Sequence, residues 1–269
     1  MKKTLSSEIS VTRDERVDSS PSSKGNQVKW RTHSGLWIKA DDLGYEGLAE
    51  TVASKLLEKS NLTSFAPYAQ CIITEEDVKY RGCVSDEFLA PGESLITIHR
   101  LYEIHTRDVY AELDGKSAAQ KFADLIESVT SMTRIREFAS WFGRLLEFDA
   151  FILNEDRHLH NIAVIRKADE SFRLMPVFDN GAAFLSDYKR DYPLSAKTIR
   201  LIDKVRSKPI VTQFDKQIAA VREVVGLSLK LNSNTEFAPD AFSYYSDDEL
   251  GRVNQVIKIQ SNRYPHLFT

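Results

Sequence analysis

Ionisable side chains are concentrated in residues 148–181, which read FDAFILNEDRHLHNIAVIRKADESFRLMPVFDNG. Three of these residues could act together: Asp156, Asn161 five positions later, and Asp179. An aspartate can orient a hydroxyl and accept its proton, whereas carboxylate and amide oxygens are ligands that Mg²⁺ prefers. The spacing therefore indicates phosphoryl transfer from a metal-bound nucleotide, with Asp156 as catalytic base and Asn161 and Asp179 as metal ligands.

A short β-hairpin is expected to bring these three residues together. Ile162–Ile165 and Phe172–Phe178 have the composition of strands, and the polar segment Lys167–Ser171 has that of the turn between them. Because a hairpin returns the chain to its starting point, Asp156 and Asn161 before it should lie close to Asp179 after it. A second class of site is also open here, since His158-Leu159-His160 beside an aspartate could bind zinc or manganese in a hydrolase.

We prefer other roles for the two histidines, because no third histidine lies within easy reach in the sequence. His158 is expected to brace the loop through a backbone hydrogen bond and to lie at the nucleotide site, and His160 to be partly exposed. Arg157 could pair with an aspartate or with a phosphate, and the residues alone do not decide between these partners.

The elements that position this site begin with two predicted strands, Val28–Thr32 and Leu36–Lys39, joined by a turn at His33–Gly35. The preceding loop, residues 22–27, contains Gly25, Asn26 and Gln27. Glycine permits the close approach and unusual backbone angles that let N–H groups face phosphates, so this loop is either a phosphate-binding loop or an ordinary connection.

An amphipathic helix is predicted over Tyr45–Lys59, with leucines and valine on one face. Lys39 on the strand before it could pair with Glu46 or Glu50, as the nucleotide lysine of a kinase pairs with a helix glutamate. Glu50 lies near the apolar face and is the favoured partner, whereas Glu46 is expected to be a solvated surface charge.

The remaining pattern predicts an α+β, two-lobed fold of the protein-kinase type. Strand-like runs at Tyr68–Thr74 and Tyr80–Leu89, with a turn at Asp77–Lys79, precede a break at Pro91–Glu93. Predicted helices then cover residues 116–131, 136–153, 214–225 and 247–262, the last opened by a capping box at Ser246–Glu249. We expect a mobile leader at residues 1–20, a β-rich N-lobe at 21–92 and a helical C-lobe at 93–269.

The composition of the chain argues against several other classes of protein. The 269 residues carry a net charge of −3, which gives no bulk attraction to nucleic acid or to an anionic membrane. Cys71 and Cys83 do not suggest a disulfide framework or a zinc site, and no apolar stretch is long enough to span a bilayer. We therefore expect a cytoplasmic protein, or one that a bacterium delivers as an effector, with no direct nucleic-acid or membrane partner.

Several motifs together resemble those of the HipA-like serine/threonine kinases, bacterial proteins with a fold related to the phosphoinositide kinases. The segments that carry this resemblance are Asn154–Asn161 (NEDRHLHN), Pro176–Gly181 (PVFDNG), Gly25–Lys29 (GNQVK), Trp37–Lys39 (WIK) and Ser207–Pro209 (SKP). The resemblance covers about residues 22–216. Full-length members of the family carry an additional N-terminal subdomain that has no counterpart in these residues, so the chain is similar to a short, core-only branch of the family.

The resemblance implies ATP and Mg²⁺ as cofactors, Lys39 at the α/β-phosphates and autophosphorylation at Ser22, with Ser23 adjacent. A phosphate there would repel the phosphates of ATP. We also place the nucleotide hinge at Glu87-Phe88-Leu89. Expected partners are an unidentified protein substrate and, because many family members are toxins of toxin–antitoxin pairs, an antitoxin or a separately encoded N-terminal subdomain. The alternative to a kinase is a pseudokinase that acts as a regulatory binding module, followed by the metal-dependent hydrolase.

Overall fold

The computed structural model describes residues 8–17, 27–232, 237 and 242–268. The strands are β1 (Glu8–Val11), β2 (Arg16–Val17), β3 (Lys29–Arg31), β4 (Leu36–Ala40), β5 (Ala69–Glu75), β6 (Val78–Asp86), β7 (Ser94–Thr97), β8 (Ala163–Arg166) and β9 (Phe172–Leu174). The α-helices are α1 (Glu46–Leu57), α2 (Ile98–Ile104), α3 (Val109–Leu113), α4 (Ala118–Thr133), α5 (Phe138–Ile152), α6 (Thr198–Ile202), α7 (Phe214–Val224) and α8 (Asp247–Arg263). Short 3-10 helices, η1 (Arg13–Glu15) and η3 (Pro265–Phe268), complete the described elements.

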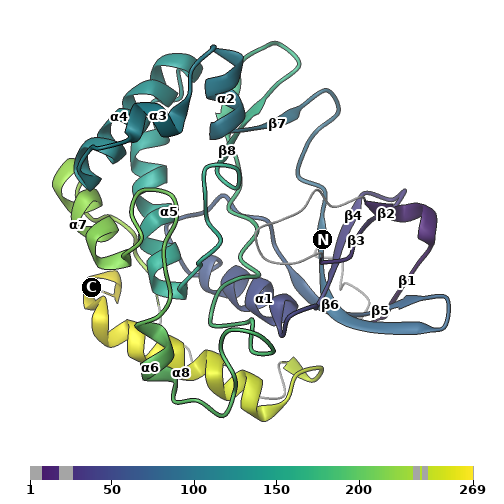
Figure 1. The fold of residues 1–269 in the computed structure, drawn as a ribbon. Coiled ribbons are helices and arrows are strands. Elements are labelled where there is room, and N and C mark those ends of the chain that lie inside the picture. The colour runs from purple at the N-terminus through teal and green to yellow at the C-terminus, as the bar shows by residue number, and fades with distance from the viewer. Residues whose placement is uncertain (1–7, 18–26, 233–236, 238–241, 269) are drawn as a thin grey trace.

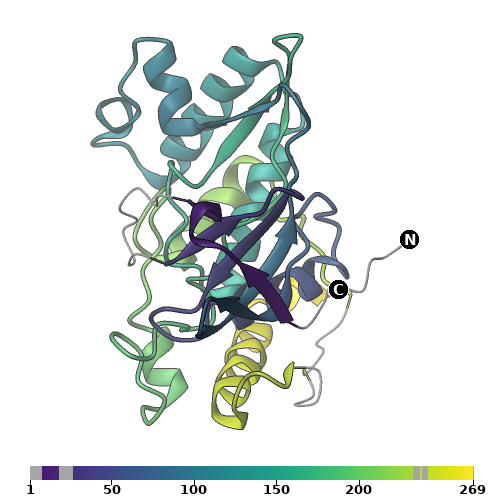
Figure 2. The ribbon, with the colours of Figure 1, turned by 90° about the vertical axis from the view of Figure 1, so that its right-hand side faces the viewer.

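The first six strands form one sheet in the order β1-β5-β6-β4-β3-β2. Figure 1 shows this sheet on one side of the molecule and most of the helices on the other, and Figure 2 views the molecule from the side of the sheet. The turn between β5 and β6 is shorter than expected: Glu75 pairs with Val78, so Glu76 and Asp77 alone make the turn. Glu76 takes a positive φ of 52°, as a residue of a tight hairpin turn does.

The expectation of a mobile leader over residues 1–20 is wrong for residues 8–17. β1 pairs in parallel with β5, and β2 pairs antiparallel with β3, so the segment supplies both edges of the sheet. Val11 is buried with Trp30 and Ile38 in a small core on the outer face of the sheet. The charged composition misled the prediction because an edge strand buries only one of its faces and keeps the other polar.

Helix α1 lies between the sheet and the helical part of the molecule (Figure 1), and ten of its twelve residues are buried. Its close packing on the sheet depends on Gly47, because a Cβ there would meet the Gly82 carbonyl carbon at 2.6 Å. Within the sheet, a Cβ on Gly82 would meet the Lys39 carbonyl oxygen of the neighbouring strand at 2.0 Å. Because the helix can approach the sheet so closely, Glu50, one turn after Gly47, faces the inner end of β4.

The predicted hairpin is present, but its second strand is shorter than expected. β8 pairs with β9 and with β7 in a three-stranded antiparallel sheet. The strand predicted to run to Phe178 ends at Leu174. Val177 pairs instead with Phe65, with hydrogen bonds from Val177 N–H to the Ser64 carbonyl (2.8 Å) and from Ala66 N–H to the Val177 carbonyl (2.9 Å). This crossing carries Asp179 away from the hairpin and toward α1.

The helical part is built around α5, which is almost entirely buried and packs against α4, α7 and α8. The capping box predicted at Ser246–Glu249 is confirmed: the Ser246 hydroxyl accepts from the Glu249 N–H at 3.3 Å, and the Glu249 carboxylate accepts from the Ser246 N–H at 2.8 Å. One continuous core joins α1 to these helices. The inner side of α1 is therefore held as rigidly as the helical part itself.

Candidate active site

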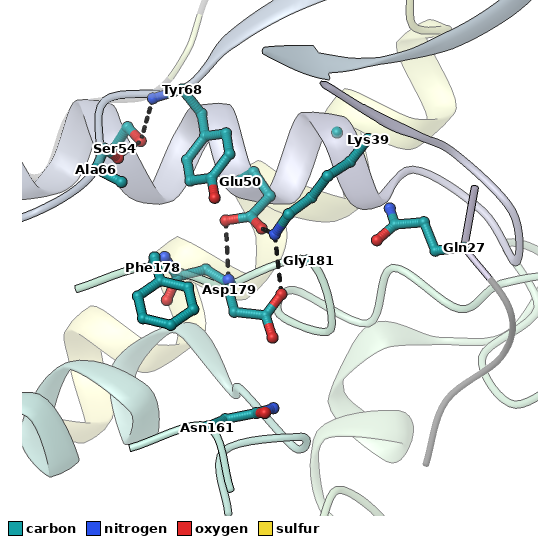
Figure 3. Close-up of polar contacts among 12 residues, drawn as sticks. Gln27, Lys39, Glu50, Ser54, Ala66, Tyr68, Asn161, Phe178, Asp179 and Gly181 are labelled. Atoms are coloured by element: carbon teal, nitrogen blue, oxygen red, sulfur yellow. Dashed lines mark hydrogen bonds and ion pairs between the residues drawn. The ribbon is translucent and has the colours of Figure 1, made fainter. Parts of the chain in front are cut away.

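A buried ion-pair cluster joins three distant parts of the chain. Lys39 on β4 places its Nζ 2.6 Å from Glu50 Oε1 on α1 and 2.9 Å from Asp179 Oδ1 (Figure 3). The second oxygen of Glu50 accepts from the Asn180 N–H at 2.8 Å. Glu50 thus holds both the lysine and the backbone of the loop that carries Asp179. The favoured Lys39–Glu50 pair is present.

Burial makes these charges depend on one another. Lys39 is 5% exposed and Glu50 is fully buried. Burial acts to lower the pKa of Lys39, but the carboxylates of Asp179 and Glu50 more than offset it and hold this pKa well above its ordinary value. In turn, the charge of Lys39 lowers the pKa of Asp179. The lysine and Asp179 therefore both stay charged at neutral pH.

Lys29 adds a second positive charge to this cluster. It lies directly opposite Lys39 in the β3–β4 pair, and its charge contributes to lowering the pKa of Asp179. Like charges directly opposite each other destabilise a sheet, so the pair needs anions beside it. Asp179 and Glu50 provide two, and the arrangement suits further anionic groups such as the phosphates of a nucleotide.

Glu46 takes a different place from the one expected. Its carboxylate accepts from three successive backbone N–H groups, those of Asp42 (3.2 Å), Leu43 (2.7 Å) and Gly44 (3.1 Å). It is therefore a half-buried brace of the β4–α1 loop and not a solvated charge. Three backbone donors in one turn satisfy a carboxylate without any lysine, which leaves Lys39 to Glu50.

Arg157 is the buried centre that connects the segment Asn154–Asn161, the predicted catalytic loop, to the loop of Asp179. Its Nε donates to Asp149 Oδ2 at 3.0 Å, one terminal nitrogen donates to the Phe178 carbonyl at 2.7 Å, and the other donates to Asn180 Oδ1 at 2.8 Å. The side chain is 1% exposed. From the sequence, Arg157 could have paired with either an aspartate or a phosphate. The structure shows that its partner is Asp149.

Asp149 itself is fully buried on α5, and burial raises its pKa even though Arg157 and Asn154 both donate to it. Asn154 also donates from Nδ2 to the Asp179 carbonyl at 3.3 Å. The two loops are therefore tied together twice, through Arg157 and through Asn154. The positions of Asp156 and Asp179 relative to each other follow from these contacts more than from the hairpin.

Asn161 closes the catalytic loop on itself. Its Nδ2 donates to the Asp156 carbonyl at 2.9 Å, and its N–H donates to the His158 carbonyl at 2.8 Å. With the amide nitrogen engaged in this way, the side-chain oxygen is the atom left to act as a ligand. Figure 3 shows Asp179 between Lys39 and Asn161, and the terminal nitrogen of Arg157 that binds Phe178 also reaches the Asn161 carbonyl at 3.4 Å.

The carboxylate of Asp156 is held by a lysine that the sequence did not assign to it. Lys208 Nζ lies 2.5 Å from Asp156 Oδ1. The side chains are 34% and 14% exposed, so this pair is open to water on one side. Lys208 belongs to the Ser207-Lys208-Pro209 segment, which the resemblance singled out without a role.

The two histidines do not form a metal site. His158 Nδ1 accepts from the His160 N–H at 3.2 Å, which is the predicted bracing of the loop by a backbone hydrogen bond. The His160 ring stacks on His99 with centroids 4.1 Å apart. Within residues 8–17, 27–232, 237 and 242–268, no three histidine, cysteine or carboxylate side chains gather in a group that could hold a metal ion. The described residues therefore offer no ligand set of the kind that the hydrolase alternative requires.

Two of the three backbone N–H groups of the predicted hinge segment form hydrogen bonds within the chain. Glu87 N–H donates to the Gly35 carbonyl at 2.8 Å, and Leu89 N–H donates to the Glu87 side chain at 3.1 Å. The ring of Phe88 packs on Phe178 with centroids 5.3 Å apart. Phe88 and Phe178 pack against a small apolar cluster of Ala66, Tyr68 and Cys83, and Lys39 Nζ lies 5.1 Å from the centre of the Tyr68 ring.

Of the predicted phosphate loop, the structure describes only Gln27. Gln27 donates from Nε2 to the Ala40 carbonyl at 2.8 Å, at the end of β4, and so lies beside the lysine strand (Figure 3). Gly25, Asn26, Ser22 and Ser23 lie outside the described residues. The sequence reasoning gave no role to Lys29, Tyr68 or Phe178 and left the partner of Arg157 open. Lys29 and Phe178 did have a signal, because both lie in segments that carry the family resemblance.

The fold and the site define a two-lobed kinase-like architecture, with a lysine–glutamate pair between a sheet and a helix and an acidic loop facing it. The chain matches no protein-family model and no curated protein sequence. Among solved structures, the crystal structure of the Helicobacter pylori proinflammatory kinase CtkA is similar over 95% of both chains, with a TM-score of 0.62 and 14% sequence identity.

A chain of the Shewanella oneidensis MR-1 toxin–antitoxin complex of HipA, HipB and operator DNA is similar over 91% of this chain and 65% of its own, with a TM-score of 0.48 and 14% identity. A TM-score of 0.48 is too low to support a conclusion about this chain. The likeness to CtkA confirms the predicted α+β kinase-like fold, and the resemblance that the motifs indicated is confirmed at the level of this fold. No helix in the described part of the chain is long and apolar enough to cross a membrane.

Proposed function

We propose that the protein is an ATP- and Mg²⁺-dependent serine/threonine protein kinase. The observation that carries the proposal is the convergence of Lys39, Glu50 and Asp179 from β4, α1 and the loop after β9, within ion-pair distance of one another. Asp156 and Asn161 belong to the loop that Arg157 ties to the same place. Phosphoryl transfer needs this kind of assembly, because catalysis by kinases is mainly positioning and charge stabilisation.

The N-terminal side of the site would hold the nucleotide. Lys39 would contact the α/β-phosphates, with Glu50 fixing its direction and Lys29 adding a second positive charge. The phosphate loop would include Gly25, Asn26 and Gln27. Adenine would lie against the apolar cluster of Ala66, Tyr68 and Cys83 together with Phe88 and Phe178, because the Tyr68 ring of this cluster lies next to Lys39.

The opposite side would hold the metal and the acceptor hydroxyl. Asn161 supplies an amide oxygen and Asp179 a carboxylate, a donor set that fits a hard cation which keeps waters and phosphates as its other ligands. When bound, Mg²⁺ supplies charge neutralisation between the β- and γ-phosphates. Asp179 adopts a left-handed φ of 61°, an uncommon conformation that aspartate tolerates better than most residues and that is frequent at functional sites. Asp156 would orient the hydroxyl and receive its proton.

The substrates are this chain itself and a second protein. Autophosphorylation at Ser22 or Ser23 would place a dianion where the phosphates of ATP bind, and so silence the enzyme. His158 would lie at the edge of the nucleotide site. A role as the toxin of a toxin–antitoxin pair, with an antitoxin or a separately encoded subdomain as partner, remains a prediction from the sequence motifs.

The test is the intact mass of the purified protein before and after incubation with ATP and Mg²⁺. Wild-type protein is expected to gain phosphate mapped to Ser22 or Ser23, and Asp179→Asn to gain none. Asp169→Asn, the same substitution in the exposed β8–β9 turn, serves as the control and should behave as wild type. A wild-type protein that starts without phosphate, gains none and does not bind ATP would overturn the kinase in favour of a pseudokinase or regulatory binding module.

A further inference from the structure

A groove of about 400 Å³ opens beside the catalytic loop. Three lysines line it from three different segments: Lys121 on α4, Lys208 before α7 and Lys216 on α7, with residues 210–213 between them. Lys208 is the same side chain that lies 2.5 Å from Asp156. The groove is therefore continuous with the candidate active site.

The lysines of the groove are not neutralised by the acidic residues near them in the sequence. Asp124, three positions after Lys121, pairs with Lys116 at 2.6 Å. Asp215, next to Lys216, is held by Arg263 and Tyr264. Lys121 and Lys216 form no ion pair with any residue that the structure describes. The groove is thus a local concentration of positive charge on a chain whose net charge is −3.

The groove also has an apolar side. Ile210 is buried and Val211 is half-buried, and both lie between the lysines. An isolated anion would not use such contacts, whereas a peptide backbone with carboxylate side chains would use both the apolar surface and the lysines. Lys208 is already paired with Asp156, so Lys121 and Lys216 carry most of the positive charge that is open to a ligand. These separated charges, together with the apolar side chains, fit an extended acidic peptide.

We propose that this groove binds an acidic segment of the protein substrate next to the serine or threonine that is phosphorylated. The inference deepens the proposed function and rests on it. Because Lys208 touches Asp156, a substrate carboxylate that reaches Lys208 lies near the acceptor hydroxyl in sequence, since extended chain covers about 3.3 Å per residue. The substrate carboxylate also gives Lys208 a second partner, which releases Asp156 to the hydroxyl. Lys121 and Lys216 bind acidic side chains farther along the segment.

The test compares three peptides that differ only in the residues around one serine: glutamates, glutamines or lysines. Wild-type enzyme is expected to phosphorylate the glutamate peptide with a kcat/KM at least about tenfold above that of the glutamine peptide, because charge-assisted contacts contribute on that scale. The Lys121→Glu/Lys216→Glu variant should lose this preference and shift toward the lysine peptide. Lys258→Glu, an exposed lysine on α8 away from the groove, should keep the wild-type preference.

Binding of a fluorescent glutamate peptide separates failure of the groove from failure of the kinase. If the wild type binds the glutamate peptide, the double variant does not, and the wild type transfers phosphate to none of the peptides, the groove is supported and the kinase is overturned. Equal transfer to the glutamate and glutamine peptides would overturn the groove and leave the kinase standing. A wild-type protein that neither binds the glutamate peptide nor phosphorylates any of the peptides would overturn both the groove and the kinase. Displacement of the peptide by a single-stranded oligonucleotide of equal charge, as readily as by unlabelled peptide, would overturn peptide recognition.

Discussion

On the inner side of the site, Lys39, Glu50 and Arg157 are at most 5% exposed, and each is held by partners from at least two other segments. On the outer side, Lys208 is 34% exposed along its side chain and faces Asp156 across a pair that water reaches. The two sides use the same residue types in different surroundings. Burial decides whether a charge is a fixed part of the fold or is able to exchange its partner.

The difference has an energetic basis. A charge in the interior has no water to replace a lost partner, so removing one member of a buried pair leaves the other at a cost of several kcal/mol. An exposed pair loses little, because water solvates both charges after separation. The inner side therefore holds its lysine in one place, as the proposed contact with nucleotide phosphates requires, whereas the outer side can exchange partners, as the proposed contact with a substrate requires. Substitutions on each side should show this contrast.

The largest effect is expected from Arg157→Leu. It leaves Asp149 as a buried carboxylate without its main partner and removes the donors to the Phe178 carbonyl and Asn180, so the free energy of unfolding should fall by about 3–5 kcal/mol. Urea unfolding measures this change. Arg13→Ala, which breaks an exposed pair with Glu76, is the control and should cost less than about 1 kcal/mol. Equal costs for both variants would contradict the contrast.

A second large effect is expected from pH through Asp41, at the end of β4. Burial raises the pKa of this carboxyl to about 7. Because the folded-state pKa lies above the ordinary value, the carboxyl favours folding below about pH 4, and this contribution is lost as the pH rises through about 7. With about 1.4 kcal/mol per pK unit, the loss amounts to as much as about 4 kcal/mol.

Asp41→Asn removes this titration while keeping an oxygen that can accept from the Gly47 N–H, which now donates to Asp41 at 2.6 Å. The measurement is the free energy of unfolding in urea at pH 5 and pH 8. Wild type should lose stability relative to the variant over this interval. A stability difference between the two proteins that stays constant with pH would contradict the burial of the Asp41 carboxyl that the structure shows.

An intermediate effect is expected from Gly47→Ala. Alanine is the better helix former by about 0.5–1 kcal/mol, but here its Cβ would lie 2.6 Å from Gly82, so α1 must move from the sheet at a cost of about 1–3 kcal/mol. Gly251→Ala in α8 is the matched control, because nothing lies within 4 Å of its Cβ. Thermal unfolding should show destabilisation for Gly47→Ala and stabilisation for Gly251→Ala. Stabilisation by both would disprove the close packing that positions Glu50.

The smallest effect on stability is expected from Lys208→Met. Its pair with Asp156 is open to water, so the free energy of unfolding should change by less than about 1 kcal/mol. Lys39→Met removes a lysine from the inner side of the same site and leaves Glu50 and Asp179 without their shared cation, which should cost more. Urea unfolding of the two variants side by side gives the comparison. A larger loss for Lys208→Met would reverse the roles of the two sides.

Much of the site was predictable because its signals are local. The spacing of Asp156 and Asn161 within one loop, and the bracing of that loop by His158, depend on neighbours a few residues away. The periodicity that predicted α1 also placed Glu50 near its apolar face, and this selected Glu50 over Glu46 as the partner of Lys39. Capping boxes and hydrophobic periodicity depend on the same short range.

What the sequence missed depends on pairing between distant segments. Residues 8–17 have a polar composition, and only the edges of the sheet at β5 and β3 make them strands. β9 ends at Leu174 because Val177 finds a partner at Phe65, which no local pattern around Val177 indicates.

The chemical types in the site, the elements that carry them and the kinase-like division into a sheet-rich and a helical part could all be inferred from the residue order. The electrostatics could not: Arg157 is buried on Asp149, Lys29 stands opposite Lys39 and Lys208 reaches Asp156 only because the chain is folded. The physical reason is that the strength of a charge interaction depends on distance and burial, and both are properties of the packed chain and not of residue order.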